Sequence, residues 1–540
     1  MFSTLIGAAS GPGSSSRVRV MARAAVASAL VPALLLGAGA PAVAATNTLT
    51  VTTLDRNGKK VTVTTTVVNL ATNERRSVTS NKAKKLPKGT YAVLASIRTG
   101  ETSTLGARTV KVSGASKTTV DARKGKRVSL GLSPAIDTAG REIRTMARIC
   151  TVGKSSYEHV GAADLGGGLY VVPNSSKRLA FAAMRSWVDH SGASPHYVVK
   201  YRTTGVPSSP TRTFAQSSLG TVDVESRRGP SAGTLSNLAV QPADRACGDE
   251  MYGLLFDTEQ PYRTKLHLSA GKWYVRAHAR AEAKDGSAPV VGSYLVPRTV
   301  SAGKSQTVRF FRSAWGPSTR LPQINYGWLS YSLNDMFADP GFPRDSVEGG
   351  DKATAMLKFG GKTVKTKKDR GWESEMTSLE YKVKKSGWYT LTNDASRYYP
   401  EITFPAGMLS PKTSVTYRFK AKPNTSVTAP VYALTMLPTG LDLHNRAKAG
   451  GSTNVQLKLS RPKAGPDAKL GKNPKVKTVT AKASFDGGKT WRSVSVKKID
   501  GVWTAQVGNP TSGAVSLRAR VTDTIGGYTD VTIIRAYAIG

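Results

Sequence analysis

Short segments in which apolar and polar residues alternate recur along this chain, and they constrain its fold more than any other feature. One such segment runs from Trp273 to Arg280. Its apolar members are Trp273, Val275, Ala277 and Ala279. Because successive side chains of a β-strand point to opposite faces, this spacing places all four on one face. The 52 Gly and 28 Pro favour turns between such strands. The sequence therefore predicts an all-β fold.

The chain has 540 residues, too many for one domain of roughly 100 to 200 residues. Strand and turn patterns divide it into a leader and four units. The leader is residues 1–44, and the units are residues 45–132, 133–317, 318–428 and 429–540. The predicted architecture is a series of tandem β-sandwich domains.

In the first unit, a Pro- and Gly-containing turn leads into a strand. Alternation places Tyr91, Val93, Ala95 and Ile97 on one face of that strand. The Gly-x-Tyr entry after a turn resembles the carboxypeptidase regulatory-like, or transthyretin-like, sandwich. This resemblance implies a small β-sandwich over residues 45–132.

In the last unit, an alternating strand ends at the hairpin Asp486–Lys489, and a second alternating strand follows. The inward positions of these strands are Val479, Ala481, Ala483 and Phe485, then Val515, Leu517, Ala519 and Val521. The pattern resembles an immunoglobulin-like or fibronectin type III-like sandwich.

The start of the chain has the three parts of a secretory signal. Arg17, Arg19 and Arg23 form a basic region, the run from Ala24 to Leu36 is apolar, and Ala42-Val43-Ala44 fits a cleavage site. Met21 is an alternative start. The apolar run is short for a bilayer-spanning helix. We therefore expect a signal peptide at 1–44, no membrane span in the mature chain, and an extracellular, secreted or cell-wall-associated protein.

The formal charge of +42 attracts polyanions. The stretch Arg446–Asp500 is dense in charge, with 14 Lys and Arg against 3 Asp and Glu. Outside a Gram-positive cell the nearest polyanions are teichoic acids and acidic polysaccharides. Nucleic-acid binding would call for a basic motif interleaved with aromatic residues or a known reading module, and neither is found. An anionic cell-wall polymer or an extracellular protein is the expected partner, and a face that only maintains solubility is the alternative.

Cys150 and Cys247 are the two cysteines of the chain. In an exported protein this count predicts one structural disulfide. No C-x-x-C is present, so thiol redox chemistry and a thiolate metal site are not expected.

One hairpin in the last unit matches the Asp-box pattern S-x-D-x-G-x-T-W. The matching residues are Ser484, Asp486, Gly488, Thr490 and Trp491. Asp486 is expected to accept backbone hydrogen bonds while Trp491 packs under the turn. Sialidase propellers carry several copies with an arginine triad. A single copy favours a structural role.

Acidic residues cluster in a Gly- and Pro-containing loop at Asp335, Asp339, Asp345, Glu348 and Asp351. Carboxylate oxygens at this density suit Ca²⁺, although the spacing matches no EF-hand. The loop is a weak calcium candidate, and no other metal site or cofactor is expected.

No catalytic motif is found. The two Gly-Gly-Lys-Thr strings hold Met356 and Ala483 where a phosphate loop needs glycine. No H-E-x-x-H or G-x-S-x-G occurs. The sequence predicts a protein that is not an enzyme.

Three further stretches share a pattern with a known family: Thr118–Lys126, Ala483–Trp491, and Val515–Asp523 with Ile533–Tyr537. They resemble the non-catalytic C-terminal region of secreted subtilisin-like serine peptidases of Gram-positive bacteria. Those peptidases carry D-[ST]-G, H-G-T-H and G-T-S-M. Asp137-Thr138-Ala139-Gly140 breaks the first motif, and the other two are absent. No catalytic residue is carried over.

The favoured function is a secreted, non-catalytic string of β-sandwiches that acts at the cell envelope or as an accessory to extracellular proteins. The alternative is an extracellular hydrolase, acting on peptides or glycans, whose best candidate loop is Asp335–Asp351. A third hypothesis is a relic of a peptidase gene with no activity of its own.

Overall fold

The computed structural model describes residues 47–152, 158–191, 195–229, 235–243, 247, 254–344, 346–347, 351–369, 377–463, 469–470 and 474–540. The predicted signal at 1–44 lies outside these residues. Within them, every regular element is a strand apart from two 3₁₀ turns, η1 (Ala122–Lys124) and η2 (Gln216–Ser218). This confirms the predicted all-β class. No helix in the described part of the chain is long and apolar enough to cross a membrane.

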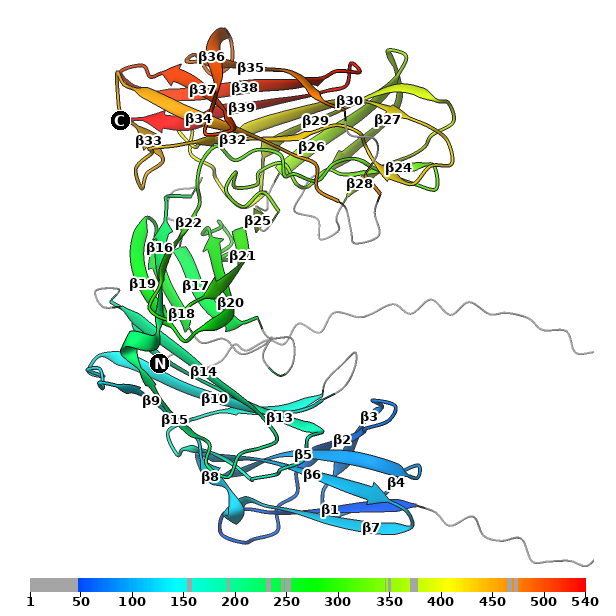
Figure 1. The fold of residues 1–540 in the computed structure, drawn as a ribbon, viewed down its shortest axis with the longest axis vertical. Helices are drawn as coiled ribbons and strands as arrows, with labels where there is room; N and C mark the ends of the chain where they lie inside the picture. The colour runs from blue at the N-terminus through cyan, green and yellow to red at the C-terminus, as the bar shows by residue number, and fades with distance from the viewer. Residues whose placement is uncertain are drawn as a thin grey trace, which may run out of the picture. The chain divides into compact units, whose positions relative to one another are not determined.

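The strands of the described residues, drawn as arrows in Figure 1, form seven sheets. The strands up to residue 133 are β1 (Thr48–Leu54), β2 (Thr64–Asn69), β3 (Arg75–Thr79), β4 (Ala83–Lys85), β5 (Gly89–Thr99), β6 (Thr102–Val112), β7 (Ala115–Asp121), β8 (Lys126–Arg127) and β9 (Ser129–Ser133). The next are β10 (Arg141–Thr151), β11 (His159–Ala163), β12 (Leu169–Val171), β13 (Leu179–Asp189), β14 (His196–Thr204), β15 (Thr211–Ala215), β16 (Gly220–Ser226), β17 (Leu235–Pro242), β18 (Leu254–Glu259), β19 (Tyr262–Leu268), β20 (Gly271–Arg280), β21 (Val290–Val300) and β22 (Ser305–Phe310).

The remaining strands are β23 (Gln323–Asn325), β24 (Trp328–Ser332), β25 (Ser346–Val347), β26 (Asp351–Phe359), β27 (Lys362–Asp369), β28 (Ser378–Lys382), β29 (Gly387–Arg397), β30 (Lys412–Ala421), β31 (Val427–Thr428), β32 (Ala433–Pro438), β33 (Arg446–Ala447), β34 (Ser452–Ser460), β35 (Val476–Ser484), β36 (Arg492–Ile499), β37 (Val502–Gly508), β38 (Ala514–Asp523) and β39 (Tyr528–Ile539).

Strand β5 is buried on both of its faces. The predicted set Tyr91, Val93, Ala95 and Ile97 packs in one core with residues of β1 and β7. Ala92 and Leu94, on the opposite face, pack in a second core with residues of β10 and β13. The six-stranded sheet β3-β2-β5-β6-β12-β8 also crosses residue 133, because β12 pairs in parallel with β6. The unit boundaries stay a prediction, but backbone pairing runs across this one.

The second unit contains the seven-stranded sheet β11-β10-β13-β14-β19-β16-β22 and four strands of the five-stranded sheet β18-β17-β20-β21-β25, whose last strand, β25, belongs to the third unit. In β20, Trp273, Val275, Ala277 and Ala279 are fully buried, as the alternation predicts. Cys150 and Cys247 form a disulfide with a Cα–Cα distance of 5.5 Å and a sequence separation of 97. It closes a long loop, a constraint that lowers the entropy of the unfolded chain.

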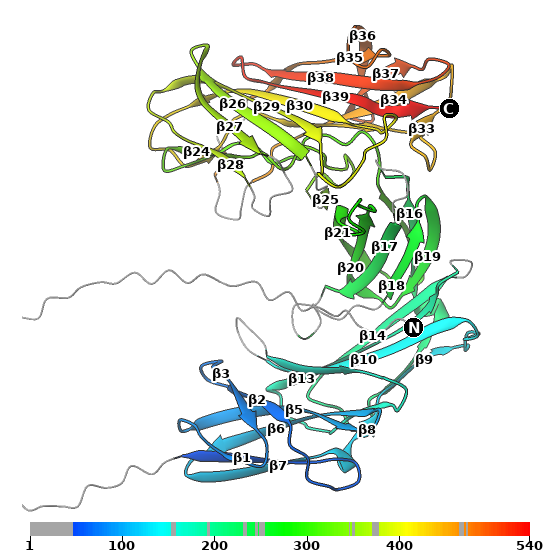
Figure 2. The ribbon, with the colours of Figure 1, turned by 180° about the vertical axis from the view of Figure 1, so that it is seen from behind.

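Strands of the third and fourth predicted units join in one layer, which we call the long layer. Its strand order is β27-β26-β29-β30-β39-β38-β35 (Figures 1 and 2). The joining pair is β30 with β39, antiparallel from Thr413 opposite Ile533 to Arg418 opposite Tyr528. Backbone pairing therefore joins strands on either side of residue 428, where the sequence predicts a boundary.

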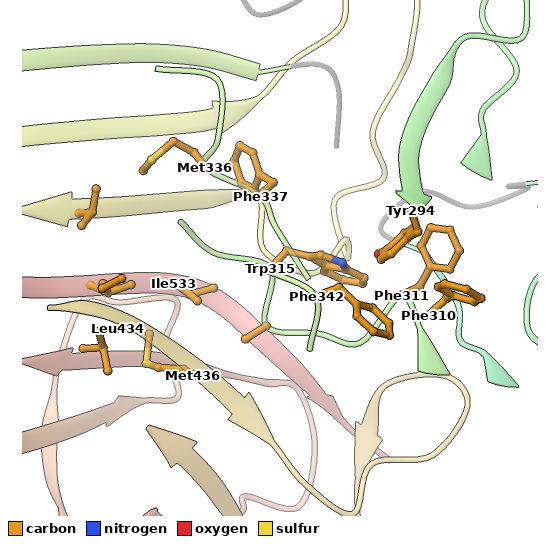
Figure 3. Close-up of a cluster of buried hydrophobic side chains, with 14 of the residues drawn as sticks. Tyr294, Phe310, Phe311, Trp315, Met336, Phe337, Phe342, Leu434, Met436 and Ile533 are labelled. Carbon is orange, nitrogen blue, oxygen red and sulfur yellow. The ribbon is translucent and has the colours of Figure 1, made fainter. Parts of the chain in front are cut away.

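Two smaller layers cover the inner face of the long layer. The sheet β28-β24-β23-β31 covers one half, where the Tyr331 and Tyr417 rings meet edge to face at 5.9 Å. Strands β37, β34 and β32 cover the other half, where Leu434 and Met436 face Ile533 (Figure 3). The long layer is therefore the shared half of two adjoining sandwiches.

One hydrophobic core extends from the second unit into the fourth. It includes an aromatic group formed by β21 and the end of β22, where the Tyr294 ring lies 5.2 Å from that of Phe310 and 4.7 Å from that of Phe311 (Figure 3). Trp315 continues this core and is fully buried. The segment that joins the second and third units is thus packed and does not form a solvated linker.

Asn445 fixes this joining segment. Its Nδ2 donates to the backbone oxygens of Arg228 at 3.0 Å and Phe311 at 2.9 Å, and its Oδ1 accepts from Ser313 N at 3.1 Å. A backbone bond from Arg228 N to Leu443 O, 2.8 Å, lies beside it. Asn445 is fully buried, so loss of its side chain leaves buried polar groups without partners.

We expect Asn445→Ala to lower the free energy of unfolding by about 2–4 kcal/mol, because each unsatisfied buried group costs about 1–3 kcal/mol. Asn445 has φ 58°, so part of the loss comes from backbone strain. Asn424→Ala is the matched control, because Asn424 is exposed with φ 53°. Urea denaturation measures both. Equal destabilisation of the two variants would contradict the assigned role.

Candidate anion-binding face

The outer face of the long layer is defined by strand register. Opposite residues of antiparallel strands share a face. One row across the layer consists of Thr354, Asp394, Ser414, Thr532, Arg518 and Lys482, and the next row of Met356, Thr392, Thr416, Asp530, Arg520 and Thr480. Small hydroxyl side chains stand in the middle of these rows together with Asp394 and Asp530. We call this surface the outer face.

Basic side chains dominate the outer face. Its Lys and Arg residues are Lys352, Lys358, Lys368, Lys412, Arg418, Lys420, Lys482, Arg518 and Arg520. All of the lysines are exposed, and the arginines are partly exposed. The carboxylates in the same rows are Asp394 and Asp530. Cations at this density attract anions, most strongly at low ionic strength.

Asp530 offsets only one of the positive charges on this face, because two arginines share it. Arg518 Nε donates to Asp530 Oδ1 at 2.9 Å, and Arg520 Nε donates to Oδ2 at 2.7 Å. The hydrogen bond to Asp530 raises the pKa of Arg518. The side chain of Asp530 is only 9% exposed, while those of both arginines are 42% exposed. The carboxylate therefore holds the two guanidinium groups in place, and the site keeps a net positive charge.

A groove of about 350 Å³ lies on the outer face. Its lining includes Lys352, Lys412, Asp394, Ser396, Ser414, Thr532 and Ile534. Lys352 and Lys412 both stand opposite Ser396 on neighbouring strands. Short side chains therefore form the floor, and the two lysines rise beside it. A second hollow of about 200 Å³ lies around Arg518, Arg520 and Lys482. Because Arg518 stands opposite Thr532, the two hollows adjoin.

Contacts with aromatic rings restrict the conformations of several of these basic side chains. Arg418 lies 4.1 Å from the ring centroid of Trp388, and Lys420 Nζ lies 5.1 Å from it. Lys352 Nζ lies 3.5 Å from the ring centroid of Tyr398. Such contacts limit the freedom of long side chains while leaving the charge accessible. The face can hold an extended anion, with hydroxyl and ammonium donors along its length.

The Asp-box hairpin is held by side-chain hydrogen bonds. Asp486 Oδ1 accepts from Ser484 Oγ at 2.7 Å, and Oδ2 accepts from Thr490 Oγ1 at 2.5 Å. Gly488 N donates to Ser484 Oγ at 2.8 Å. The bond from the Thr490 hydroxyl is the largest of several that hold the pKa of Asp486 far below its usual range. The described geometry satisfies the carboxylate within the hairpin, which fits a structural role.

Gly488 brings the hairpin close to the groove. Its φ is 91°, and a Cβ there would lie 2.7 Å from Ile534 Cδ1 and 3.5 Å from the Trp491 ring. Ile534 also lines the groove. The hairpin therefore supports one end of the outer face.

The three acidic loop residues that the structure describes, Asp335, Asp339 and Asp351, do not form one cluster, although the charge of Asp335 acts on Asp351. Asp339 is fully buried and accepts from Arg312 N at 2.9 Å and Gly341 N at 2.7 Å. Asp335 accepts from Arg320 Nη1 at 3.0 Å. Asp345 and Glu348 lie outside the described residues. Among the residues described, no group of three or more His, Cys, Asp or Glu is placed to hold a metal ion. Calcium binding by this loop stays a prediction.

Asp351 differs from its neighbours because it is buried without full hydrogen bonding. It is 2% exposed, and its Oδ2 has no hydrogen-bond partner among the residues that the structure describes. It stands opposite Arg397. Burial, and next the charge of Asp369, raise the pKa of Asp351 to about 7. Asp369, in contrast, accepts a hydrogen bond from Thr377 Oγ1 at 2.8 Å. A carboxyl in this position favours the protonated form near neutral pH.

Comparison of this chain with family models and with curated proteins finds no match. Three similar solved structures are the FN1–FN3 domains of chicken CNTN1 (9% identity, 59% of this chain and 99% of that one, TM-score 0.14), a streptococcal ancillary pilin (11%, 49% and 98%, 0.12) and a putative membrane anchored protein from Corynebacterium diphtheriae (10%, 74% and 96%, 0.13). These scores are too low for any of them to define topology or function here. The resemblance to subtilisin-associated regions stays a prediction.

Proposed function

We propose that this protein is an exported, non-catalytic β-sandwich protein that binds an anionic polymer of the cell envelope through the outer face. One observation carries the proposal: nine basic side chains lie on a single hydroxyl-rich face that holds two carboxylates in its rows. One of these carboxylates, Asp530, is shared by Arg518 and Arg520. The signal-peptide pattern of residues 1–44 supports placing the protein outside the cell.

The shape of the face suits a chain more than a compact ligand. The groove and the adjoining hollow follow one another across β26, β29, β30, β39 and β38. Repeating phosphates or carboxylates can occupy successive cation sites along such a path, and each contact releases counterions. Teichoic acids and acidic polysaccharides both offer this repeating charge.

The test is binding of the mature chain to poly(glycerol phosphate) and to polygalacturonate, measured by calorimetry between 50 and 300 mM NaCl. We expect both polymers to bind, with affinity falling at least tenfold over this range. Dextran, a neutral polymer, is the control. Absence of binding at 50 mM NaCl, or equal binding of dextran, would overturn the proposal.

A hydrolase remains the competing function, and its test is separate. The outer face holds no histidine or cysteine in its described rows. A hydrolase screen of the purified chain against peptides and glycans should show no turnover. Activity that disappears in Asp345→Asn would favour the enzyme.

A further inference from the structure

The turn between β23 and β24 exposes two aromatic side chains. Tyr326 is 83% exposed and Trp328 is 51% exposed, in contrast to the buried aromatic residues of the core. Asn325 stands opposite Trp328, so Tyr326 and Gly327 form a two-residue hairpin loop. We call Tyr326, Trp328 and the neighbouring Lys382 the aromatic tip. A contiguous exposed apolar patch with a polar rim is a feature of binding sites.

The backbone of this loop is strained at the aromatic residue itself. Tyr326 has φ 49° and Gly327 has φ 78°. Two positive φ values are typical of a type I′ turn, which favours Asn or Gly at its first position. Tyrosine is disfavoured there, because a Cβ is crowded in left-handed backbone. Tyr326 therefore combines a strained backbone with an exposed ring, and strained residues of this kind cluster at functional positions such as ligand-binding sites.

Hydrogen bonds from neighbouring segments hold the strained loop. Tyr326 N donates to Ser426 Oγ at 2.9 Å, and Gly327 N donates to Thr425 O at 2.9 Å. Val383 N donates to Gly327 O, also at 2.9 Å. A Cβ on Gly327 would lie 2.7 Å from Asn424 N. The loop is fixed on both sides, so the two rings are presented from a rigid base.

Lys382 gives the tip its charge. It stands opposite Trp328, its Nζ lies 5.5 Å from the Trp328 ring centroid, and it donates to Tyr326 O at 3.4 Å. Lys384, which follows Val383, is exposed. Glu380, also exposed, lies one row farther from the loop, opposite Ser330. The immediate surroundings of the rings are therefore basic.

We propose that the aromatic tip binds an acidic sugar unit of a glycan. The C–H face of a pyranose ring is apolar and slightly positive, so it stacks on the electron-rich face of an indole or phenol ring. A uronic acid adds a carboxylate that the Lys382 ammonium can pair with. Charge complementarity selects an acidic sugar over a neutral one. The tip lies on β23 and β24, not on the outer face, so this inference goes beyond the proposed function and does not depend on it.

The test uses the mature chain carrying Lys352→Glu and Lys412→Glu, so that binding on the outer face does not obscure the tip. Tetragalacturonate is titrated and followed by calorimetry. In this background, Trp328→Ala should weaken binding at least tenfold, and Tyr326→Gly about fivefold. Phe485→Ala is the matched control, because Phe485 is an aromatic residue 38% exposed on another hairpin, and it should bind as the parent does.

Tyr326→Gly also distinguishes a loss of binding from a loss of folding. Glycine suits the left-handed backbone at this position, so the melting temperature should stay the same or rise while binding falls. Maltotetraose, a neutral analogue, should bind at least fivefold more weakly than tetragalacturonate.

Several results would overturn the proposal. They are no binding of tetragalacturonate, unchanged binding in Trp328→Ala, or an equal effect of Trp328→Ala on short-chain polyphosphate, which has no ring to stack. Binding of the tip to phosphatidylglycerol vesicles in place of tetragalacturonate would assign it to membranes.

Discussion

Reversing two charges on the outer face, by Lys352→Glu and Lys412→Glu in one chain, is expected to weaken binding of poly(glycerol phosphate) by about 30-fold or more at 50 mM NaCl. The large effect follows from where the two lysines lie. Both lysines stand beside the Ser396 floor of the groove, where an anion bound in the groove meets both. Exposed ion pairs are individually weak, but each reversal replaces an attraction with a repulsion.

The salt dependence should change together with the affinity. Two lost phosphate contacts reduce the slope of log K against log salt by about two, since each contact releases close to one counterion. Lys85→Glu with Lys88→Glu is the matched control, because both residues are exposed and lie in the first unit. That variant has the same net charge. Equal losses in the two variants would show that binding reflects overall charge and not the outer face.

Asp351→Asn is expected to stabilise the protein at neutral and higher pH, by up to about 4 kcal/mol at pH 8. Burial raises the pKa of Asp351 to about 7, against about 3.9 in an unfolded chain. Because the folded state holds this proton more tightly, the group stabilises the fold most below pH 4. That contribution is lost as the pH rises from 4 to 7. Asparagine carries no charge at any of these values.

The measurement is urea denaturation of the variant and the parent at pH 4.5, 6 and 8. The difference between their unfolding free energies should grow with pH and level off above 7. Asp394→Asn is the control, because Asp394 is exposed on the same layer. A variant less stable than the parent at pH 8 would mean that Asp351 is ionised and paired, with Arg397 the nearest cation by register.

Local patterns in the sequence predict local structure well. The alternation from Trp273 to Ala279 identifies the buried face of β20. The Asp-box spacing predicts the contacts of Asp486 because Ser484 and Thr490 lie within four residues of it. In β20 the periodicity alone decides which face is buried, and in the Asp-box hairpin the interacting residues are close in sequence.

Alternation does not say which strands pair, and this limits what can be predicted. Ala92 and Leu94 of β5 look like solvent-facing positions until β10 and β13 cover them. Strands β30 and β39 are separated by more than a hundred residues, and nothing in either one indicates the other. The long layer arises from such a pairing.

The sequence does not predict the outer face, because this face also depends on which strands pair. The dense charge of residues 446–500 is visible in the sequence, and Lys482 of that stretch does lie on the outer face. Lys352 and Lys412 belong to the preceding predicted unit, and Arg518 lies beyond the dense stretch. Only register across β26, β29, β30, β39 and β38 brings them together.

Lysine footprinting tests the central claim most directly. The mature chain is acetylated at low reagent concentration, with and without poly(glycerol phosphate), and the modified lysines are quantified by mass spectrometry. The outer-face account predicts protection of Lys352, Lys412 and Lys482, with Lys85 and Lys88 labelled equally in both samples. Uniform protection of all five, or protection confined to the first unit, would contradict it.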